Sequence, residues 1–157
     1  MNKPGHPTPP FDTASPPYEL DGYGWAMAQA KRIRERRFDQ LDIENIAEEI
    51  ESVGKSEQSA AESALRLIIM HILKWQHQPE RRSRSWAVTI RTQRIRYEIV
   101  MRKNPGLMSQ LEEMRANAYR LARSEAEGET DLPESSFTEE PLDWATILDT
   151  PFEYMSA

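Results

Sequence analysis

The sequence predicts an all-α protein: an antiparallel bundle of about five helices, with a disordered N-terminal tail and an acidic C-terminal tail. Apolar residues recur at intervals of three and four along much of the chain, which is the spacing of one helix face. Alternation of period two never persists, so no strand is expected. The chain has 157 residues, which fits one domain with a single sizeable core.

Composition divides the chain into three predicted regions. Residues 1–17 contain six prolines, so we expect a disordered or extended tail there. Residues 18–128 form the predicted helical bundle domain. Residues 129–157 are acidic and interrupted by prolines, and a short helix over 142–148 would dock this extension partly through Trp144, Ile147 and Leu148.

The first two helices are predicted over 18–37 and 42–53. Asp21 would cap the first helix, with Trp25, Ala28 and Ile33 facing inward and Tyr23 a further candidate for this face. Asp42 would cap the second, and Gly54 would end it in the left-handed conformation that costs glycine nothing. The residues of the second helix that we expect to face inward are Ile43, Ile46, Ala47, Ile50 and Val53.

A third helix, capped by Ser56 and running to about Gln76, is predicted to be central, because it is apolar nearly all round from Ala64 to Trp75. Its least apolar and most solvent-exposed side would carry Arg66, Met70 and Lys74. Pro79 ends it, since the residue before a proline avoids helical conformation.

The fourth and fifth helices follow the turn after Pro79. Ser83 or Ser85 would cap the fourth, which runs to about Lys103, and the turn 104–106 leads into the fifth. The residues of these two helices that are expected to face inward are Trp86, Ile90, Tyr97, Met101, Leu107, Leu111, Met114, Ala118 and Leu121.

The net charge of −6 is unevenly distributed. Residues 39–62 are acidic with Lys55 as their one base, residues 74–103 are basic, and no base follows Arg123. Blocks of opposite sign in a small domain usually neutralise one another. We therefore expect Arg81, Arg82 and Arg84 to tie their turn to the acidic second helix, and the alternative is a basic face kept for an anionic partner.

Several classes of protein are disfavoured by composition. There is no cysteine, which removes disulfides, thiolate metal sites and cysteine nucleophiles and suits a reducing cytoplasm. No apolar run is long enough to cross a membrane, and residues 1–11 lack the apolar core of a secretory signal. We predict a cytoplasmic protein with no cofactor.

His71 is the one histidine inside an apolar helix. It could serve as a metal ligand or general base with Glu44, Glu48 or Glu49, but the motifs of helical metal sites are absent. Glu48 and Glu49 are adjacent and point about 100° apart, so they cannot act as a pair. The favoured interpretation is a buried neutral histidine beside a solvated or salt-bridged acidic face, with no metal and no catalytic residue.

The turn Pro79–Trp86 holds arginines beside two serines at the start of a helix. Arginine forks and free N–H groups together can bind phosphate. Trp75 and Trp86, however, lie at core spacing, and the net negative charge argues against nucleic acid as a partner. Binding of nucleic acid through Arg81 to Arg96 is the weakest of the hypotheses that we carry.

Four segments of the chain carry a resemblance to a known family. Asp21 with Trp25, residues 38–45, residues 48–54 and residues 73–86 resemble the pattern of the bacterial domain-of-unknown-function family numbered 29. The resemblance implies a small helical bundle with no assigned activity, so no catalytic residue is carried over. It draws attention to a polar cluster, functional or structural: Glu48, Glu49, His71, Gln76, Gln78, Glu80, Arg84, Ser85 and Trp86.

We predict from these observations a noncatalytic protein-interaction module that binds a protein partner or forms a homodimer. The alternative is a small metal-assisted hydrolase or nucleic-acid-processing enzyme that uses His71 and the carboxylates of the second helix. The sequence leaves the ligand, the partner, the pathway, the oligomeric state and the role of His71 open.

Overall fold

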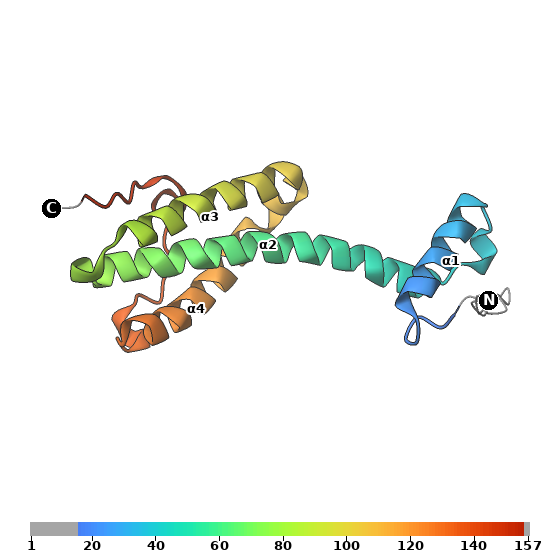
Figure 1. Ribbon diagram of the computed structural model, residues 1–157, viewed down its shortest axis with the longest axis horizontal. Helices are drawn as coiled ribbons and strands as arrows, with labels where there is room; N and C mark the ends of the chain where they lie inside the picture. Colours follow the sequence, from blue (N-terminus) through green and yellow to red (C-terminus); the bar gives the residue numbers. More distant parts are fainter. Residues whose placement is uncertain (1–15, 156–157) are drawn as a thin grey trace, which may run out of the picture. The chain divides into compact units, whose positions relative to one another are not determined.

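The structure is a computed structural model that describes residues 16–155, and it confirms the all-α prediction. Within that range the α-helices are α1 (Gly22–Arg34), α2 (Ile43–His77), α3 (Arg84–Lys103) and α4 (Leu111–Thr130), and no strand occurs (Figure 1). Short 3-10 turns, η1 to η4, lie at Phe38–Gln40, Pro79–Arg81, Pro105–Gln110 and Glu134–Ser136, and η5 (Ala145–Asp149) is a π-helical turn. No helix of the described range combines the length and apolarity that a bilayer crossing demands.

The chain divides into two compact units, residues 1–52 and residues 53–157. Polar contacts hold the described part of the first unit together: the Tyr18 hydroxyl donates to Glu49 at 2.5 Å, and Trp25 Nε1 donates to Asp42 at 2.9 Å. The backbone N–H of Asp42 in turn donates to Gln29 at 3.0 Å. Trp25 and Gln29 are the only buried residues between 16 and 52, so the described part of this unit has almost no apolar core.

Helix α2 runs through Gly54 without interruption, so the predicted break there is wrong. The backbone φ of Gly54 is not positive, and a Cβ at this position would meet nothing within 4 Å. A glycine inside a helix costs only about 1 kcal/mol relative to alanine, which flanking helix formers readily offset. Gly54 therefore weakens the helix locally and does not end it.

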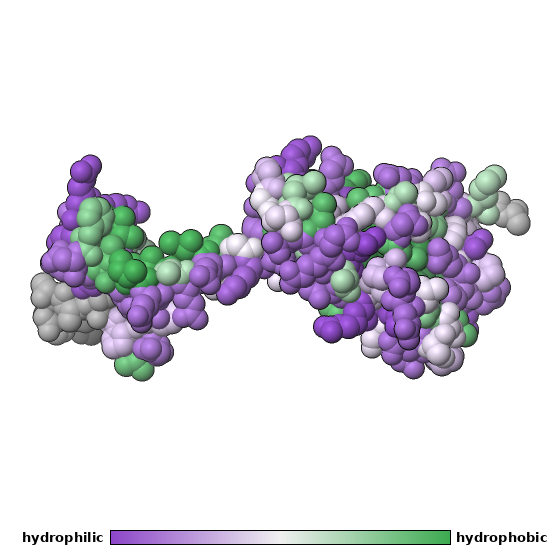
Figure 2. Space-filling model, turned by 180° about the vertical axis from the view of Figure 1, so that it is seen from behind, coloured by the Kyte–Doolittle hydropathy of each residue, from purple (hydrophilic) through white to green (hydrophobic). Residues whose placement is uncertain are grey.

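The expected inward face of residues 43–53 is also wrong. Ile43 and Ile50 are 60% and 67% exposed, and Val53 is exposed as well. Figure 2 shows apolar residues gathered on the surface of the first unit. Helical periodicity marks one face of the segment as apolar, but it does not say whether that face is covered by the same chain.

The second half of α2 is central in the second unit, as predicted. Leu65, Ile68, Ile69, Ile72 and Leu73 are fully or almost fully buried. In Figure 1, α3 lies alongside this half of α2 and α4 crosses it. Side chains from all three helices contribute to the core cluster, which makes this half of α2 the axis of the unit.

The side of α2 that was expected to be most exposed to solvent instead faces α4. Met70 and Lys74 are buried, and Lys74 Nζ lies 2.7 Å from Glu129 of α4. Arg66 pairs in the same way with Glu125, one turn earlier on α4. The prediction failed because acidic residues on a distant helix supply the partners that allow these cations to leave water.

The predicted helix caps are largely present. Asp21 accepts a hydrogen bond from the backbone N–H of Gly24 at 2.8 Å, Asp42 accepts one from Asn45 at 3.4 Å, and Ser83 accepts one from Trp86 at 3.3 Å. Helix α2 ends at His77, two residues before Pro79, as expected. Ile33 and Leu121, which were expected to face inward, are exposed, and so is the further candidate Tyr23.

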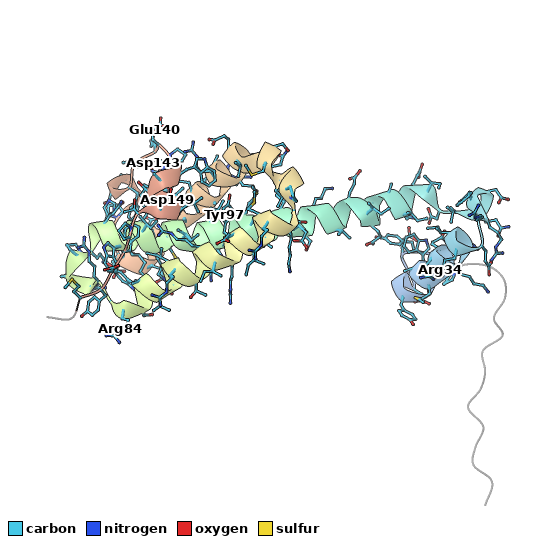
Figure 3. The ribbon with its side chains drawn as sticks, turned by 90° about the horizontal axis from the view of Figure 1, so that it is seen from above. Arg34, Arg84, Tyr97, Glu140, Asp143 and Asp149 are labelled. Atoms are coloured by element: carbon cyan, nitrogen blue, oxygen red, sulfur yellow. The ribbon has the colours of Figure 1, made fainter. Side chains whose placement is uncertain are left out.

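The segment after α4 returns over α3. Phe137 and Ile147 are buried, and the predicted helix over 142–148 is the π-helical turn η5. Arg94 of α3 holds this turn: its guanidinium donates to the backbone carbonyls of Ile147 and Thr150 at 2.8 Å and of Thr146 at 3.1 Å. Figure 3 shows Asp149, the last residue of η5, on this side of the second unit.

Candidate functional site

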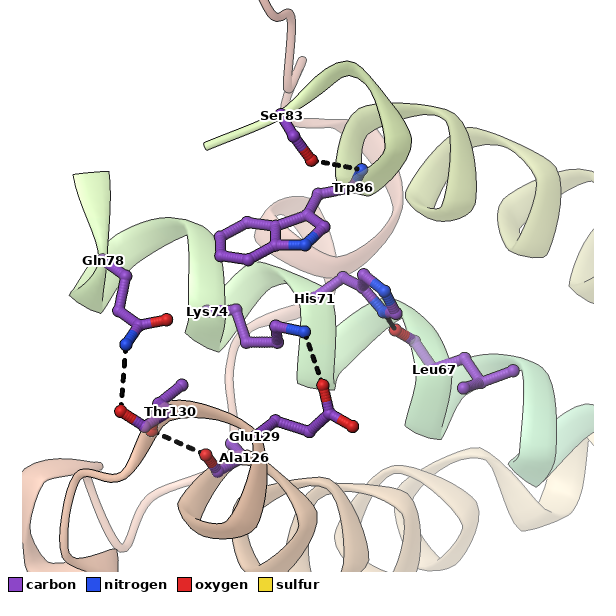
Figure 4. Close-up of polar contacts among 9 residues, drawn as sticks. All are labelled: Leu67, His71, Lys74, Gln78, Ser83, Trp86, Ala126, Glu129 and Thr130. Carbon is purple, nitrogen blue, oxygen red and sulfur yellow. Dashed lines mark hydrogen bonds and ion pairs between the residues drawn. The ribbon is translucent and has the colours of Figure 1, made fainter. Parts of the chain in front are cut away.

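A buried lysine is the centre of a polar cluster where α2 and α4 meet (Figure 4). The Lys74 side chain is 8% exposed and pairs with Glu129 at 2.7 Å. Its ammonium also lies 4.7 Å from the centroid of the Trp86 ring, a cation–π contact. Lys74 lowers the pKa of Glu129 by donating a hydrogen bond to its carboxylate and by coulombic attraction. The Glu129 carboxylate therefore stays ionised at neutral pH.

His71 lies one turn before Lys74 on α2. Its Nδ1 is 2.8 Å from the carbonyl oxygen of Leu67, so this nitrogen carries a proton and donates it to the backbone. Burial lowers the pKa of His71, and the nearby Lys74 charge lowers it further, while Glu129 and the Leu67 carbonyl oppose the shift. This is the geometry of a neutral histidine with a structural hydrogen bond.

Gln78 fastens the end of the α2–α3 hairpin to the end of α4. Its Nε2 donates to the carbonyl oxygen of Thr130 at 2.9 Å, and the Thr130 hydroxyl donates to Ala126 at 2.6 Å. Gln78 is buried, and its Oε1 has no hydrogen-bond partner among residues 16–155. Such an unsatisfied acceptor costs free energy, so the contact with Thr130 must be favourable enough to keep the side chain inside.

The nine residues of the predicted polar cluster are divided between the two units. Glu48 and Glu49 belong to the first unit, where Glu49 raises the pKa of Tyr18 to about 12 by accepting its hydroxyl proton in a hydrogen bond. The other seven belong to the second unit. Of these, the structure brings His71 and Trp86 together around Lys74, with Gln78 directly after the end of α2. The remaining four are exposed: Gln76, Glu80, Arg84 and Ser85.

Within the second unit the arginine turn contacts its own hairpin and forms no ion pair with Glu57 or Glu62, and its pairing with the acidic residues of the first unit stays a prediction. Arg82 Nε donates to the carbonyl oxygen of Trp75 at 2.9 Å, and its guanidinium lies 5.2 Å from the centroid of the Trp75 ring. Arg81 and Arg84 form no ion pair with any residue in the described range, and Figure 3 shows Arg84 projecting outward from α3. The cross-helix ion pairs join α2 to α4 instead.

Two hollows lie on the surface of the second unit. A groove of about 730 Å³ runs between α3 and residues 148–153, and its lining includes Ile90, Tyr97 and Phe152. A smaller hollow of about 350 Å³ lies between α2 and α3. Neither is lined by His71. Across residues 16–155, no three histidine, aspartate or glutamate side chains gather in a way that could hold a metal ion.

Sequence reasoning missed the residues that organise these contacts. Lys74 could have been found, because a single lysine in an apolar helix that is central to a bundle needs a buried partner. Arg94 gave no such signal, since it is one of six bases on α3 and its backbone partners lie more than fifty residues away. Glu129 and Thr130 fell in a region interpreted as an acidic extension.

Comparison with known proteins gives one match. The family model described as "Domain of unknown function DUF29" matches residues 17–153. Neither the curated proteins nor the solved structures contain a match. The expected resemblance to family 29 is thus confirmed over nearly all of the chain.

Proposed function

Because the chain belongs to the DUF29 family, whose description assigns no function, we propose one from its surface: a noncatalytic interaction module that pairs with a second copy of itself. The contact surface is the apolar face of the first unit. We place this activity in the cytoplasm, following the cysteine-free composition.

The first unit exposes an unusual number of large apolar side chains for its size. Between residues 16 and 52 only Trp25 and Gln29 are buried. The large apolar residues exposed in the same range are Leu20, Tyr23, Met27, Ile33, Phe38, Ile43 and Ile50. Contiguous exposed apolar surface of this kind is typical of a protein-interaction site.

The start of α2 carries the most regular part of this surface. Ile43, Ala47 and Ile50 are exposed and lie at i, i+4 and i+7, so they form one stripe along the helix, which we call the α2 stripe. No residue from 43 to 60 is buried, although this stretch is helical throughout. The observation that carries the proposal is this regular apolar stripe, which no side chain of residues 16–155 buries.

A second copy of the chain is the occupant that we propose. A unit this small buries too little surface to be stable alone, and homo-oligomers are the commonest way to cover such a face. The enzyme alternative has no observation in its favour. His71 donates to a backbone carbonyl, and the carboxylates assigned to it belong to the other unit.

The test is the oligomeric state of the full chain with and without the stripe. We expect the wild type to sediment as a dimer at micromolar concentration and the double variant Ile43→Glu/Ile50→Glu to sediment as a monomer, because charges cannot be buried unpaired. Circular dichroism should show unchanged helicity, since both side chains are exposed.

The matched control places the same two charges on exposed apolar residues of the second unit, in the variant Met108→Glu/Leu121→Glu. This protein should remain dimeric. A wild type that stays monomeric at every accessible concentration, or a dimeric Ile43→Glu/Ile50→Glu variant, would overturn the proposal.

A further inference from the structure

Helix α3 carries a second apolar stripe, on the face opposite the core. Val88, Ile95 and Ile99 are all exposed, and their spacing of seven and four residues places them on one side of the helix. The buried residues of α3, among them Ile90 and Tyr97, lie on the other side. We call the three exposed residues the α3 stripe.

Cations border the α3 stripe on both edges. By helix geometry Arg84 and Arg91 lie along one edge, and Arg96 and Lys103 lie along the other. All four are exposed, and none forms an ion pair with a residue in the range 16–155. Helix α3 contains six bases and one acid, Glu98, so its outer face has a strong positive field.

The α2 stripe has the opposite charge at its border. Glu44 and Glu51 are exposed and lie together along one edge of it, two turns apart. The spacing of the anchors also matches: Ile43 and Ile50 are seven residues apart, as are Val88 and Ile95. Two helices with equal apolar spacing and opposite border charges are suited to pack against each other.

We propose that, in the self-associated protein, the α2 stripe of one copy packs against the α3 stripe of the second copy. This inference rests on the proposed self-association and names its second surface. Because both edges of the α3 stripe are basic, Glu44 and Glu51 meet cations whichever way the two helices run. Antiparallel pairing of two α2 stripes would instead bring their acidic edges together, which is unfavourable.

Charge reversal on each stripe tests the pairing in the full chain. The variants are Glu44→Lys/Glu51→Lys on α2 and Arg91→Glu/Arg96→Glu on α3, at exposed positions. Each alone should weaken self-association by about tenfold or more in sedimentation equilibrium, because like charges then face each other across the contact. The control Arg81→Glu/Arg120→Glu, with the same charge change on exposed residues elsewhere, should self-associate as the wild type does.

Mixing the two charge-reversed proteins gives the decisive measurement. Each then offers the stripe that complements the other, so an equimolar mixture should form heterodimers with an affinity close to that of the wild type. Self-association of the wild type should also weaken as salt is raised. Circular dichroism on each protein checks that the helices are intact.

The outcomes separate this inference from the proposed function. If Arg91→Glu/Arg96→Glu remains dimeric while Ile43→Glu/Ile50→Glu is monomeric, the first unit mediates self-association and the α3 stripe is not its partner. If both variants remain dimeric, both proposals fall. If the charge reversals change the sedimentation coefficient at constant monomer mass, the stripes meet within one chain and the pairing between copies is excluded.

Discussion

Lys74 and His71 stand one turn apart on α2, one charged and one neutral, and the difference comes from their neighbours. Lys74 has Glu129 at 2.7 Å and the face of Trp86, which compensate for its burial. His71 donates from Nδ1 to a backbone carbonyl, a hydrogen bond that opposes the lowering of its pKa, but burial outweighs it and favours the neutral ring. The positive charge of Lys74 then adds to burial in keeping His71 unprotonated.

The lowered pKa of His71 makes the stability of the protein depend on pH. The unfolded chain protonates His71 near its ordinary pKa of about 6.5, whereas the folded chain resists protonation. The unfolded state therefore binds more protons as the pH falls from 7 to 5, and the free energy of unfolding decreases. In the variant His71→Gln this decrease should be smaller, as measured by urea unfolding at a series of pH values.

The comparison isolates one side chain, because His6 and His77 are present in both proteins and their contributions cancel. Glutamine is polar and can donate to the same Leu67 carbonyl, so the variant should still fold. Parallel stability curves for the two proteins between pH 7 and 5 would show that His71 titrates alike in the folded and unfolded chains, contrary to this prediction.

At the scale of the element, α2 decides how far the sequence could predict the fold. The apolar pattern of its second half correctly predicted the central helix, and Pro79 and Ser83 correctly predicted the hairpin that follows. Gly54 led to the wrong prediction of a helix end, because glycine occurs both directly after helices and, at a cost in free energy, inside them. Local sequence does not distinguish these cases when the residues on both sides favour helix.

The variant Gly54→Ala tests whether Gly54 lies inside a continuous helix. A Cβ meets no atom within 4 Å and the backbone φ is not positive, so alanine should fit without strain. We expect alanine to stabilise the helical conformation by about 1 kcal/mol, which would be measured as increased helicity and slower amide exchange around residue 54. Ala60→Gly, at an exposed position of the same helix, is the control and should have the opposite effect.

Reduced helicity in Gly54→Ala would mean that Gly54 adopts a left-handed conformation in solution, as it would at the end of a helix.

The limits of local sequence also explain why the C-terminal region was misjudged. The turn η5 depends on Arg94, whose carbonyl partners are remote in sequence, so a local pattern showed the apolar residues of 142–148 but not what holds them.

Over residues 16–155, the molecule combines a unit that has an apolar core with one in which only Trp25 and Gln29 are buried. Every member of the core cluster lies between residues 61 and 147. Residues 16–52 depend on a few hydrogen bonds around Trp25 and Asp42. Sequence patterns could not show this division, because both halves of α2 have a regular apolar face and only packing by distant residues distinguishes them.

Hydrogen exchange should report the division directly. We expect amides of residues 61–75 to exchange only through global opening and those of residues 22–50 to exchange through much cheaper local opening. If the protein self-associates through the first unit, protection of residues 43–50 should rise with protein concentration, whereas that of 61–75 should not. Equal protection of both segments in dilute solution would contradict the separation into two units of different stability.

The long uncovered stretch of α2 before Ala61 has a consequence for enzymatic cleavage. Residues 51–60 are held by the hydrogen bonds of the helix and include no buried side chain, so brief fraying is enough to present them to a protease. Trypsin can cut after Lys55, and the fragment that begins at Ser56 retains all members of the core cluster. Limited digestion should thus trim the chain to a resistant remnant of α2, α3, α4 and the segment that Arg94 clamps.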